Sequence, residues 1–131
     1  MILFINTAST TPEIGLVGKK IEDRMKIKGE KHLSQTLLPG IQLIFNKNKA
    51  NLGDCRAIAV VIGPGGGFSR VRTGVAVANA LAYTLGVPLR GLVEEDVPSN
   101  LKDLQRLKFS KKMVLPKYGR KPNITTRKSL K

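Results

Sequence analysis

The sequence contains little of what metal sites, disulfide frameworks and membrane proteins need: cysteine, histidine and long apolar runs. Cys55 is the single cysteine, so no intramolecular disulfide can form, and a reducing compartment fits. His32 is the single histidine, which excludes a cluster of histidine metal ligands. The first apolar run ends at Asn6 and predicts neither a signal peptide nor a membrane span. We therefore expect a cytoplasmic protein with no membrane contact, no bound metal and no cofactor.

Acidic residues are also scarce, since 9 Asp and Glu stand against 23 Lys and Arg, for a formal net charge of +14. The excess is concentrated near the C-terminus, where residues 102–131 hold 11 basic residues and 1 acidic residue. A charge of this size favours a polyanionic partner and solubility over self-association. With 131 residues, of which 41% are hydrophobic, the chain is long enough for one folded domain.

A buried strand, a glycine-rich bend and a long helix form the strongest pattern in the sequence. Residues 58–62 are an unbroken apolar run rich in β-branched side chains, as in a central parallel strand. The bend of residues 63–70 follows, and residues 71–85 then repeat apolar side chains at helical spacing until Gly86 and Pro88 end the pattern. Gly and Ala leave little bulk on more than one face of this helix, so we expect it to pack on two sides.

A second, amphipathic helix is predicted at residues 34–46. Pro39 and Gly40 favour a kink or a later start, because proline inside a helix costs about 3 kcal/mol. Ser34 is favoured as a helix cap over a nucleophile, since no histidine and carboxylate pattern accompanies it. Three strands before any helix predict an antiparallel meander, and strands joined through helices predict parallel crossovers. Strands are expected at residues 1–8, 13–17, 19–27 and 89–93.

The bend at residues 63–70 has two interpretations, an anion-binding site and a sharp turn from strand to helix. Backbone N–H groups at a helix N-terminus attract anions, and two arginines add positive charge. The bend fits neither a Walker A loop nor a dinucleotide fingerprint, so the turn is favoured. The candidate anion-binding residues are Gly65, Gly66, Gly67, Ser69, Arg70 and Arg72.

Three further features each have a structural and a functional interpretation. Cys55, beside a strand start, is favoured as a small buried residue over a reactive thiol. His32 is favoured as a surface residue over a pH sensor or an interface residue. Glu94, Glu95 and Asp96 are favoured as a solvated loop over a cation site.

The sequence beyond Asn100 divides into two segments. Three leucines at positions 101, 104 and 107 predict a short basic amphipathic helix, whereas residues 111–131 have little periodicity and are expected to be extended or disordered. We therefore divide the chain into a domain at residues 1–98 and a basic extension at residues 99–131.

The extension has three interpretations: an RNA contact, a solubilising tail, and sequence left after loss of a second domain. Aromatic residues interleave with basic ones, as stacking and phosphate contacts on RNA require. Charge alone shows affinity for polyanions without naming one. The candidate RNA-binding residues are Lys111, Lys112, Lys117, Tyr118, Arg120 and Lys121.

Four stretches of the chain resemble one known family, in the same order. They are ILFINTAST, SQTLLPGIQLIF, Leu52-Gly53-Asp54 and GPGGGFSRVRTGVAVANALAYTLGVPLRG. The last is similar to the GPGSFTGLRIG loop, helix and following strand of the TsaB family, also called YeaZ, which serves tRNA threonylcarbamoyladenosine biosynthesis. The ordered set covers about residues 1–95 and is more specific than any single stretch.

The resemblance implies an α/β fold with a mixed sheet and helices, the ribonuclease-H-like lobe of the actin-like ATPase fold. The family normally has a second lobe of similar fold, which we expect this chain to lack. The resemblance also implies a non-catalytic partner of TsaD, the subunit that transfers threonylcarbamoyl to tRNA adenosine. Asn6 stands at the place of a first-strand aspartate in ATP-using relatives, and a neutral amide is a poorer Mg²⁺ ligand than a carboxylate.

Our leading hypothesis is a shortened TsaB-like scaffold, not an enzyme, whose two helices dock on a TsaD-like subunit in tRNA N6-threonylcarbamoyladenosine modification. The same helices could form a homodimer, and the basic tail could contact tRNA. The alternatives are a nucleotide-binding ATPase-like enzyme that uses the glycine bend, and a basic RNA-binding module. The candidate partner-binding residues are Leu37, Leu38, Ile41, Val71, Val75, Ala78 and Ala82.

Overall fold

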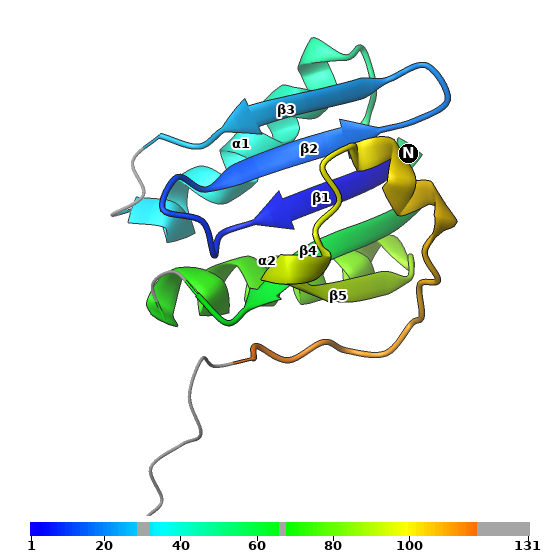
Figure 1. Ribbon diagram of the computed structural model, residues 1–131. Coiled ribbons are helices and arrows are strands. Elements are labelled where there is room, and N and C mark those ends of the chain that lie inside the picture. The colour runs from blue at the N-terminus through cyan, green and yellow to red at the C-terminus, as the bar shows by residue number, and fades with distance from the viewer. Residues whose placement is uncertain (29–31, 66–67, 118–131) are drawn as a thin grey trace, which may run out of the picture.

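The predicted strands form a five-stranded sheet in the order β3-β2-β1-β4-β5 (Figure 1). The computed structural model describes residues 1–28, 32–65 and 68–117. The first three strands pair antiparallel, whereas β4 and β5 run parallel to β1. The mixed α/β fold that the sequence predicts is therefore confirmed. The strands are β1 (Ile2–Asn6), β2 (Glu13–Val17), β3 (Glu22–Lys26), β4 (Ala57–Gly63) and β5 (Leu89–Val93).

The central strand β1 is covered on both faces. Leu3, Phe4 and Ile5 of β1 are consecutive, so they alternate between the two faces of the sheet, and all three are fully buried. This burial on both faces is the reason that β1 and β4 are apolar runs instead of alternating apolar and polar residues.

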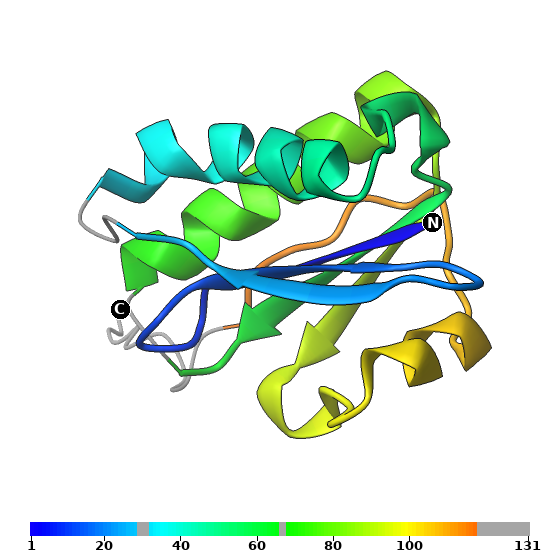
Figure 2. The same cartoon turned by 90° about the horizontal axis from the view of Figure 1, so that it is seen from above.

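Two helices, α1 (Leu33–Lys47) and α2 (Phe68–Leu85), lie side by side on one face of the sheet (Figure 2). α1 packs on β2 and β3, and α2 packs on β4 and β1. Gly74 allows α2 to approach the end of β1, because a Cβ at that position would overlap the side chain of Thr7. The small residues of α2 therefore serve first to bring the helix close to its own sheet.

The start of α1 differs from the prediction. The helix runs from Leu33 through the exposed Pro39 to Lys47. Ser34 lies inside its first turn, and the N-cap position belongs to His32, whose side chain makes no capping hydrogen bond. The predicted capping role of Ser34 is therefore wrong. His32 is exposed, in agreement with its interpretation as a surface residue.

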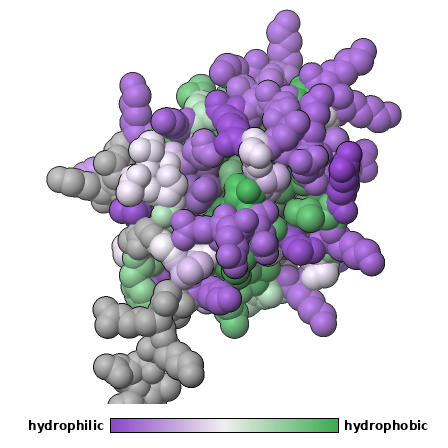
Figure 3. Space-filling model, in the orientation of Figure 1, coloured by the Kyte–Doolittle hydropathy of each residue, from purple (hydrophilic) through white to green (hydrophobic). Residues whose placement is uncertain are grey.

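The opposite face of the sheet is covered by the chain that follows β5. A 3-10 helix, η4 (Leu101–Arg106), forms where an amphipathic helix is predicted, and Leu101 and Leu104 are fully buried. Gly15 of β2 leaves room for η4, because a Cβ there would overlap Leu101. Figure 3 looks onto this face and shows hydrophilic side chains around a smaller hydrophobic area. Two short 3-10 helices, η2 (Leu52–Asp54) and η3 (Glu94–Asp96), complete the described elements.

Residues 108–117 form an extended segment, here called the strap, which lies against β5 and α2. The backbones of Ser110 and Leu89 exchange two hydrogen bonds of 2.7 and 3.0 Å. Near the end of the strap, the Lys117 N–H donates to the Ile62 carbonyl of β4 at 2.7 Å. The prediction ends the domain at residue 98, but the chain packs on the sheet as far as residue 117. Residues 118–131 lie outside the described residues.

Candidate functional site

The bend before α2 holds a carboxylate of the chain itself. The Gly65 N–H donates to Oε1 of Glu94 in η3 at 2.6 Å. A Cβ at Gly65 would overlap that carboxylate, so the glycine is needed for the contact. Gly63 has a φ of +111°, which favours glycine at the turn from β4. The favoured interpretation of the bend, a sharp turn, agrees with this geometry, and the N–H predicted for an external anion is already engaged.

The other candidate anion-binding residues have separate local contacts. The Ser69 carbonyl accepts a hydrogen bond from the Thr73 hydroxyl at 3.0 Å. Arg72 lies over the ring of Phe68, with 5.4 Å from Cζ to the ring centroid. Within the described residues, Nε of Arg70 is buried without a hydrogen-bond partner. No contact that joins these side chains to Glu94 is present in this described region, and Gly66 and Gly67 lie outside it.

The residues that follow β1 are also engaged in local structure. Oδ1 of Asn6 accepts hydrogen bonds from the N–H groups of Ala8 and Ser9 at 3.1 and 3.3 Å. Thr7 is fully buried, and its hydroxyl has no hydrogen-bond partner among the described residues. The Asn6 amide thus closes the turn after β1.

Six of the seven candidate partner-binding residues lie in the core of this chain. The sequence pattern identifies the faces that α1 and α2 turn toward their own sheet, because those faces carry the periodic apolar residues. Leu38 is the exception, with 44% of its surface exposed. The partner-binding role of the helices stays a prediction. A partner would have to contact the sides of α1 and α2 that point away from the sheet. The buried residues are Leu37, Ile41, Val71, Val75, Ala78 and Ala82.

The exposed faces of α1 and α2 carry almost no charge, a feature that apolar periodicity in the sequence does not reveal. Among the 33 residues of the two helices, Lys47, Arg70 and Arg72 are the charged ones, although 24% of the whole chain is charged. Ala76, Ala80 and Thr84 are exposed on α2, and Leu43 on α1 is 57% exposed. Tyr83 of α2 is 90% exposed. We call the exposed side of both helices the helix face.

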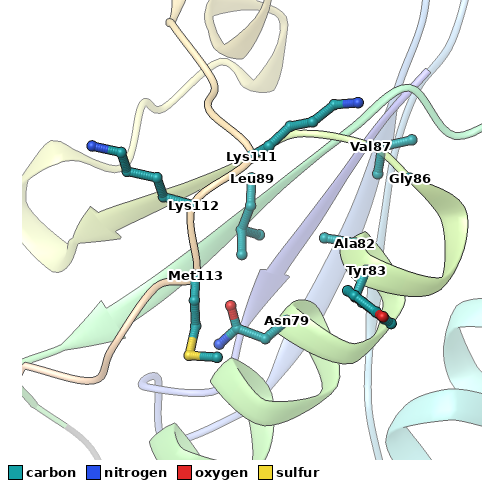
Figure 4. Close-up of a pocket in the computed structure, with 9 residues that line it drawn as sticks. All are labelled: Asn79, Ala82, Tyr83, Gly86, Val87, Leu89, Lys111, Lys112 and Met113. Atoms are coloured by element: carbon teal, nitrogen blue, oxygen red, sulfur yellow. The ribbon is translucent and has the colours of Figure 1, made fainter.

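A pocket of about 210 Å³ lies between the strap and the C-terminal half of α2 (Figure 4). Asn79 of α2 holds the strap at this point, since its amide donates to the Val114 carbonyl at 2.8 Å and accepts from the Val114 N–H at 2.9 Å. Figure 4 shows Lys111 and Lys112 pointing in opposite directions from the strap. The pocket is lined by Asn79, Ala82, Tyr83, Gly86, Val87, Leu89, Lys111, Lys112 and Met113.

Only part of the predicted RNA contact lies in the described chain. Lys111, Lys112 and Lys117 are exposed on the strap. Tyr118, Arg120 and Lys121 lie outside the described residues. The prediction of RNA contacts through this group therefore stays a prediction.

Cys55 is a buried structural residue, as the favoured interpretation predicts. It is 4% exposed, and its Sγ donates to the Ala57 carbonyl at 3.3 Å. Burial raises the pKa of its thiol, which disfavours the reactive thiolate.

Over the described residues, no group of three or more His, Cys, Asp or Glu side chains is placed to hold a metal ion. No described helix is long and apolar enough to cross a membrane.

Comparisons with known proteins agree on the fold. The family model for TsaD, described as tRNA N6-adenosine threonylcarbamoyltransferase, matches residues 27–95, more than half of the chain. No curated protein matches the sequence significantly. The solved structure of YeaZ from Pseudomonas aeruginosa is similar, with a TM-score of 0.65 and 24% identity over 70% of this chain. A second structure, of an uncharacterized protein with similarity to peptidase YEAZ from Pseudomonas aeruginosa, has a TM-score of 0.66 at 24% identity over 70% of this chain.

The match covers less than half of either relative. The chain spans 43% of the first structure and 42% of the second. At this identity the likeness shows that the fold is shared.

Proposed function

This chain belongs to the TsaD family of tRNA N6-adenosine threonylcarbamoyltransferases, and from that premise we propose that it is a non-catalytic scaffold in tRNA N6-adenosine threonylcarbamoylation. In this role it docks on a TsaD-like catalytic subunit through the helix face. The catalytic subunit transfers threonylcarbamoyl to the tRNA, and this chain provides the docking surface that supports it.

The observation that carries the proposal is the near absence of charge from the helix face. Exposed helices of soluble proteins normally carry charged residues on their solvent side. The core of a protein interface, by contrast, is depleted of charged residues and enriched in aromatic ones. Exposed Ala76 and Ala80 allow the backbone of a partner helix to approach, and exposed Leu38 and Tyr83 supply apolar area.

Contacts at the carboxyl ends of β1 and β4 support the non-catalytic part of the proposal. Ligands of open α/β sheets bind at the carboxyl ends of the strands. Here the Gly65 N–H is engaged by Glu94, and the Asn6 amide oxygen is engaged by two backbone N–H groups. A nucleotide would have to displace these contacts before it could use the same groups.

The test is co-purification of this chain with the TsaD-like protein of the same organism, with a variant that alters the helix face. Ala80→Arg places a long charged side chain on an exposed helix position, so we expect its stability to change by no more than about 0.5 kcal/mol. In the interface the same charge would be desolvated without a partner, and we expect binding to fall by about tenfold or more.

Gln105→Arg is the matched control, because Gln105 is exposed on η4 at the opposite face of the sheet. It should bind as the unmodified chain does. Failure of two folded proteins to associate would overturn the proposal, and equal binding by Ala80→Arg would exclude the helix face. Light scattering of the chain alone distinguishes self-association through the same face, which Ala80→Arg would also disrupt.

A further inference from the structure

Exposed basic side chains gather at the end of the sheet where the parallel strands begin. Val17, the last residue of β2, and Ala57, the first of β4, lie on either side of Ile2 at the start of β1. The hairpin of residues 18–21, which carries Lys19 and Lys20, therefore lies next to the start of β1. Arg56 immediately precedes β4, and its N–H donates to the Met1 carbonyl at 2.7 Å.

Two further segments reach the same end. The Asn48 amide, just after α1, donates to Oδ2 of Asp23 at 2.9 Å, which fixes the end of α1 beside the hairpin. The chain from η4 to Ser110 also passes this end, since Ser110 pairs with Leu89, the first residue of β5. Figures 1 and 2 both show the hairpin, the start of β1 and this segment at one end of the molecule. The basic end consists of Lys19, Lys20, Lys49, Arg56, Arg106 and Lys108.

The charges of the basic end are not neutralised by ion pairs. All six side chains are exposed, and the two ion pairs of the described residues, Arg24–Glu13 and Lys47–Asp23, do not include them. Nearby carboxylates accept other hydrogen bonds: Glu22 from the Leu101 N–H, and Asp54 from the Asn51 N–H. Asp103 of η4 is the remaining carboxylate of these segments. Figure 3 shows hydrophilic side chains projecting from the same side of the molecule.

The composition of the basic end favours a nucleic-acid backbone over a membrane or a protein. Peripheral membrane helices insert large apolar residues, and protein interfaces have an apolar core. The large exposed apolar residues of the described chain are Leu38, Leu43, Phe68, Tyr83, Met113 and Leu115, and none belongs to the basic end. Exposed aromatic residues for stacking on bases are likewise missing from these segments. The basic end therefore offers lysine and arginine contacts to phosphates, and such contacts do not distinguish one base sequence from another.

We propose that the basic end binds the ribose–phosphate backbone of a structured RNA. Neighbouring strands are about 4.8 Å apart, so a row across the five strands extends on the order of 20 Å. A row of that length spans several base pairs of a nucleic-acid helix and can meet several of its phosphates. The inference rests on the proposed function, which makes tRNA the RNA in question. The basic end contains none of the six candidate RNA-binding residues that the sequence suggested, which are Lys111, Lys112, Lys117, Tyr118, Arg120 and Lys121.

The test measures binding of an unmodified tRNA transcript to the full chain by fluorescence anisotropy, at salt concentrations from about 50 to 200 mM. The variant replaces Lys19 and Lys20 with Gln. The control removes the same charge from Lys26 and Lys28, which are exposed at the opposite end of β3. All four substitutions are at exposed positions, and circular dichroism and thermal melting verify that both proteins fold.

We expect the basic-end variant to lose about tenfold or more in tRNA affinity, whereas the control keeps its affinity within about twofold. The slope of log affinity against log salt should fall by about 1 for each phosphate that the variant no longer neutralises. Equal losses in both variants would overturn the proposal, because they would show a response to net charge alone. Absence of tRNA binding by the unmodified chain would also overturn it.

Vesicles with and without anionic lipid form a further arm of the experiment. Anionic vesicle binding that the same two substitutions abolish, without tRNA binding by the unmodified chain, would assign the basic end to a membrane surface. The co-purification assay separates this inference from the proposed function. An unmodified chain that docks on the TsaD-like subunit but does not bind tRNA overturns the inference alone. An unmodified chain that binds tRNA through the basic end but does not dock overturns the proposed function alone.

Discussion

The two faces of the sheet are covered by different kinds of chain. α1 and α2 cover one face with 15 and 18 residues of regular helix. The other face is covered by the chain after β5, in which η4 contributes 6 residues of 3-10 helix. Leu37 of α1 and Leu104 of η4 are nevertheless both fully buried. A short irregular segment therefore contributes to a core as fully as a helix does, where the strand beneath leaves room, as Gly15 does here.

The outer sides of the two covers differ as well. The helix face has almost no charge, whereas η4 and the residues that follow it carry Lys102, Arg106 and Lys108. A surface without charge favours contact with another protein, and a basic one favours a polyanion. We therefore propose a protein partner for the helix face and an RNA for the basic end, which includes Arg106 and Lys108.

The largest loss of stability is expected for substitutions of core leucines in the two covers of the sheet. Leu104→Ala removes a fully buried leucine from the irregular cover, and we expect the free energy of unfolding to fall by about 2–5 kcal/mol. Leu37→Ala is the matched variant in the helical cover and should cost a similar amount. Urea denaturation of both proteins measures the two losses. The account would be contradicted if Leu104→Ala cost less than about 1 kcal/mol while Leu37→Ala cost the expected amount of about 2–5 kcal/mol. That result would show that the irregular cover contributes little to the stability of the core.

A smaller effect is expected at the junction of the helical cover and the strap. Asn79→Ala leaves the Val114 N–H and carbonyl without their partner, and the expected cost is about 1–3 kcal/mol. Hydrogen exchange should accelerate at Val114 and Lys117, because the strap is released from α2. Gln42→Ala, at an exposed polar position of α1, is the control and should stay within about 0.5 kcal/mol. Unchanged exchange in the strap would mean that Asn79 does not hold it.

The smallest effect concerns the end of α1. A hydrogen bond from Asn48, together with Lys47, lowers the pKa of the Asp23 carboxyl from its ordinary value of 3.8. A lowered pKa stabilises the folded state above the ordinary value, and this contribution is lost as the pH falls through the pKa of the folded state. Asp23→Asn should therefore cost up to about 1 kcal/mol at neutral pH and progressively less below pH 3.8. A cost that does not change with pH would contradict this account.

Much of the fold could be predicted from the sequence, because its central elements follow strict periods. The apolar run before Gly63 gives β4, and the helical spacing that ends at Gly86 gives α2. The irregular cover could not be predicted in the same way. Leu101 and Leu104 show a helical spacing, but the burial of Leu101 depends on the space that Gly15 leaves on a strand far away in the sequence.

The candidate site was harder to predict, because apolar periodicity marks the inner face of a helix as strongly as a docking face. Val75 and Ala78 fit the pattern because they contact the sheet of this chain. The proposed docking face rests instead on the lack of charge at exposed positions such as Ala80, and exposure is known only once the fold is known. The contact between Glu94 and Gly65 joins residues 29 positions apart and has no local sequence pattern.

The most direct test of the docking account is a hydrogen exchange map of the chain with and without the TsaD-like subunit. We predict protection of peptides from α1 and α2 when the subunit is present, with unchanged exchange in β3 and η4. Protection confined to β3, η4 or the strap, with α1 and α2 unaffected, would contradict the assignment of the helix face to the partner.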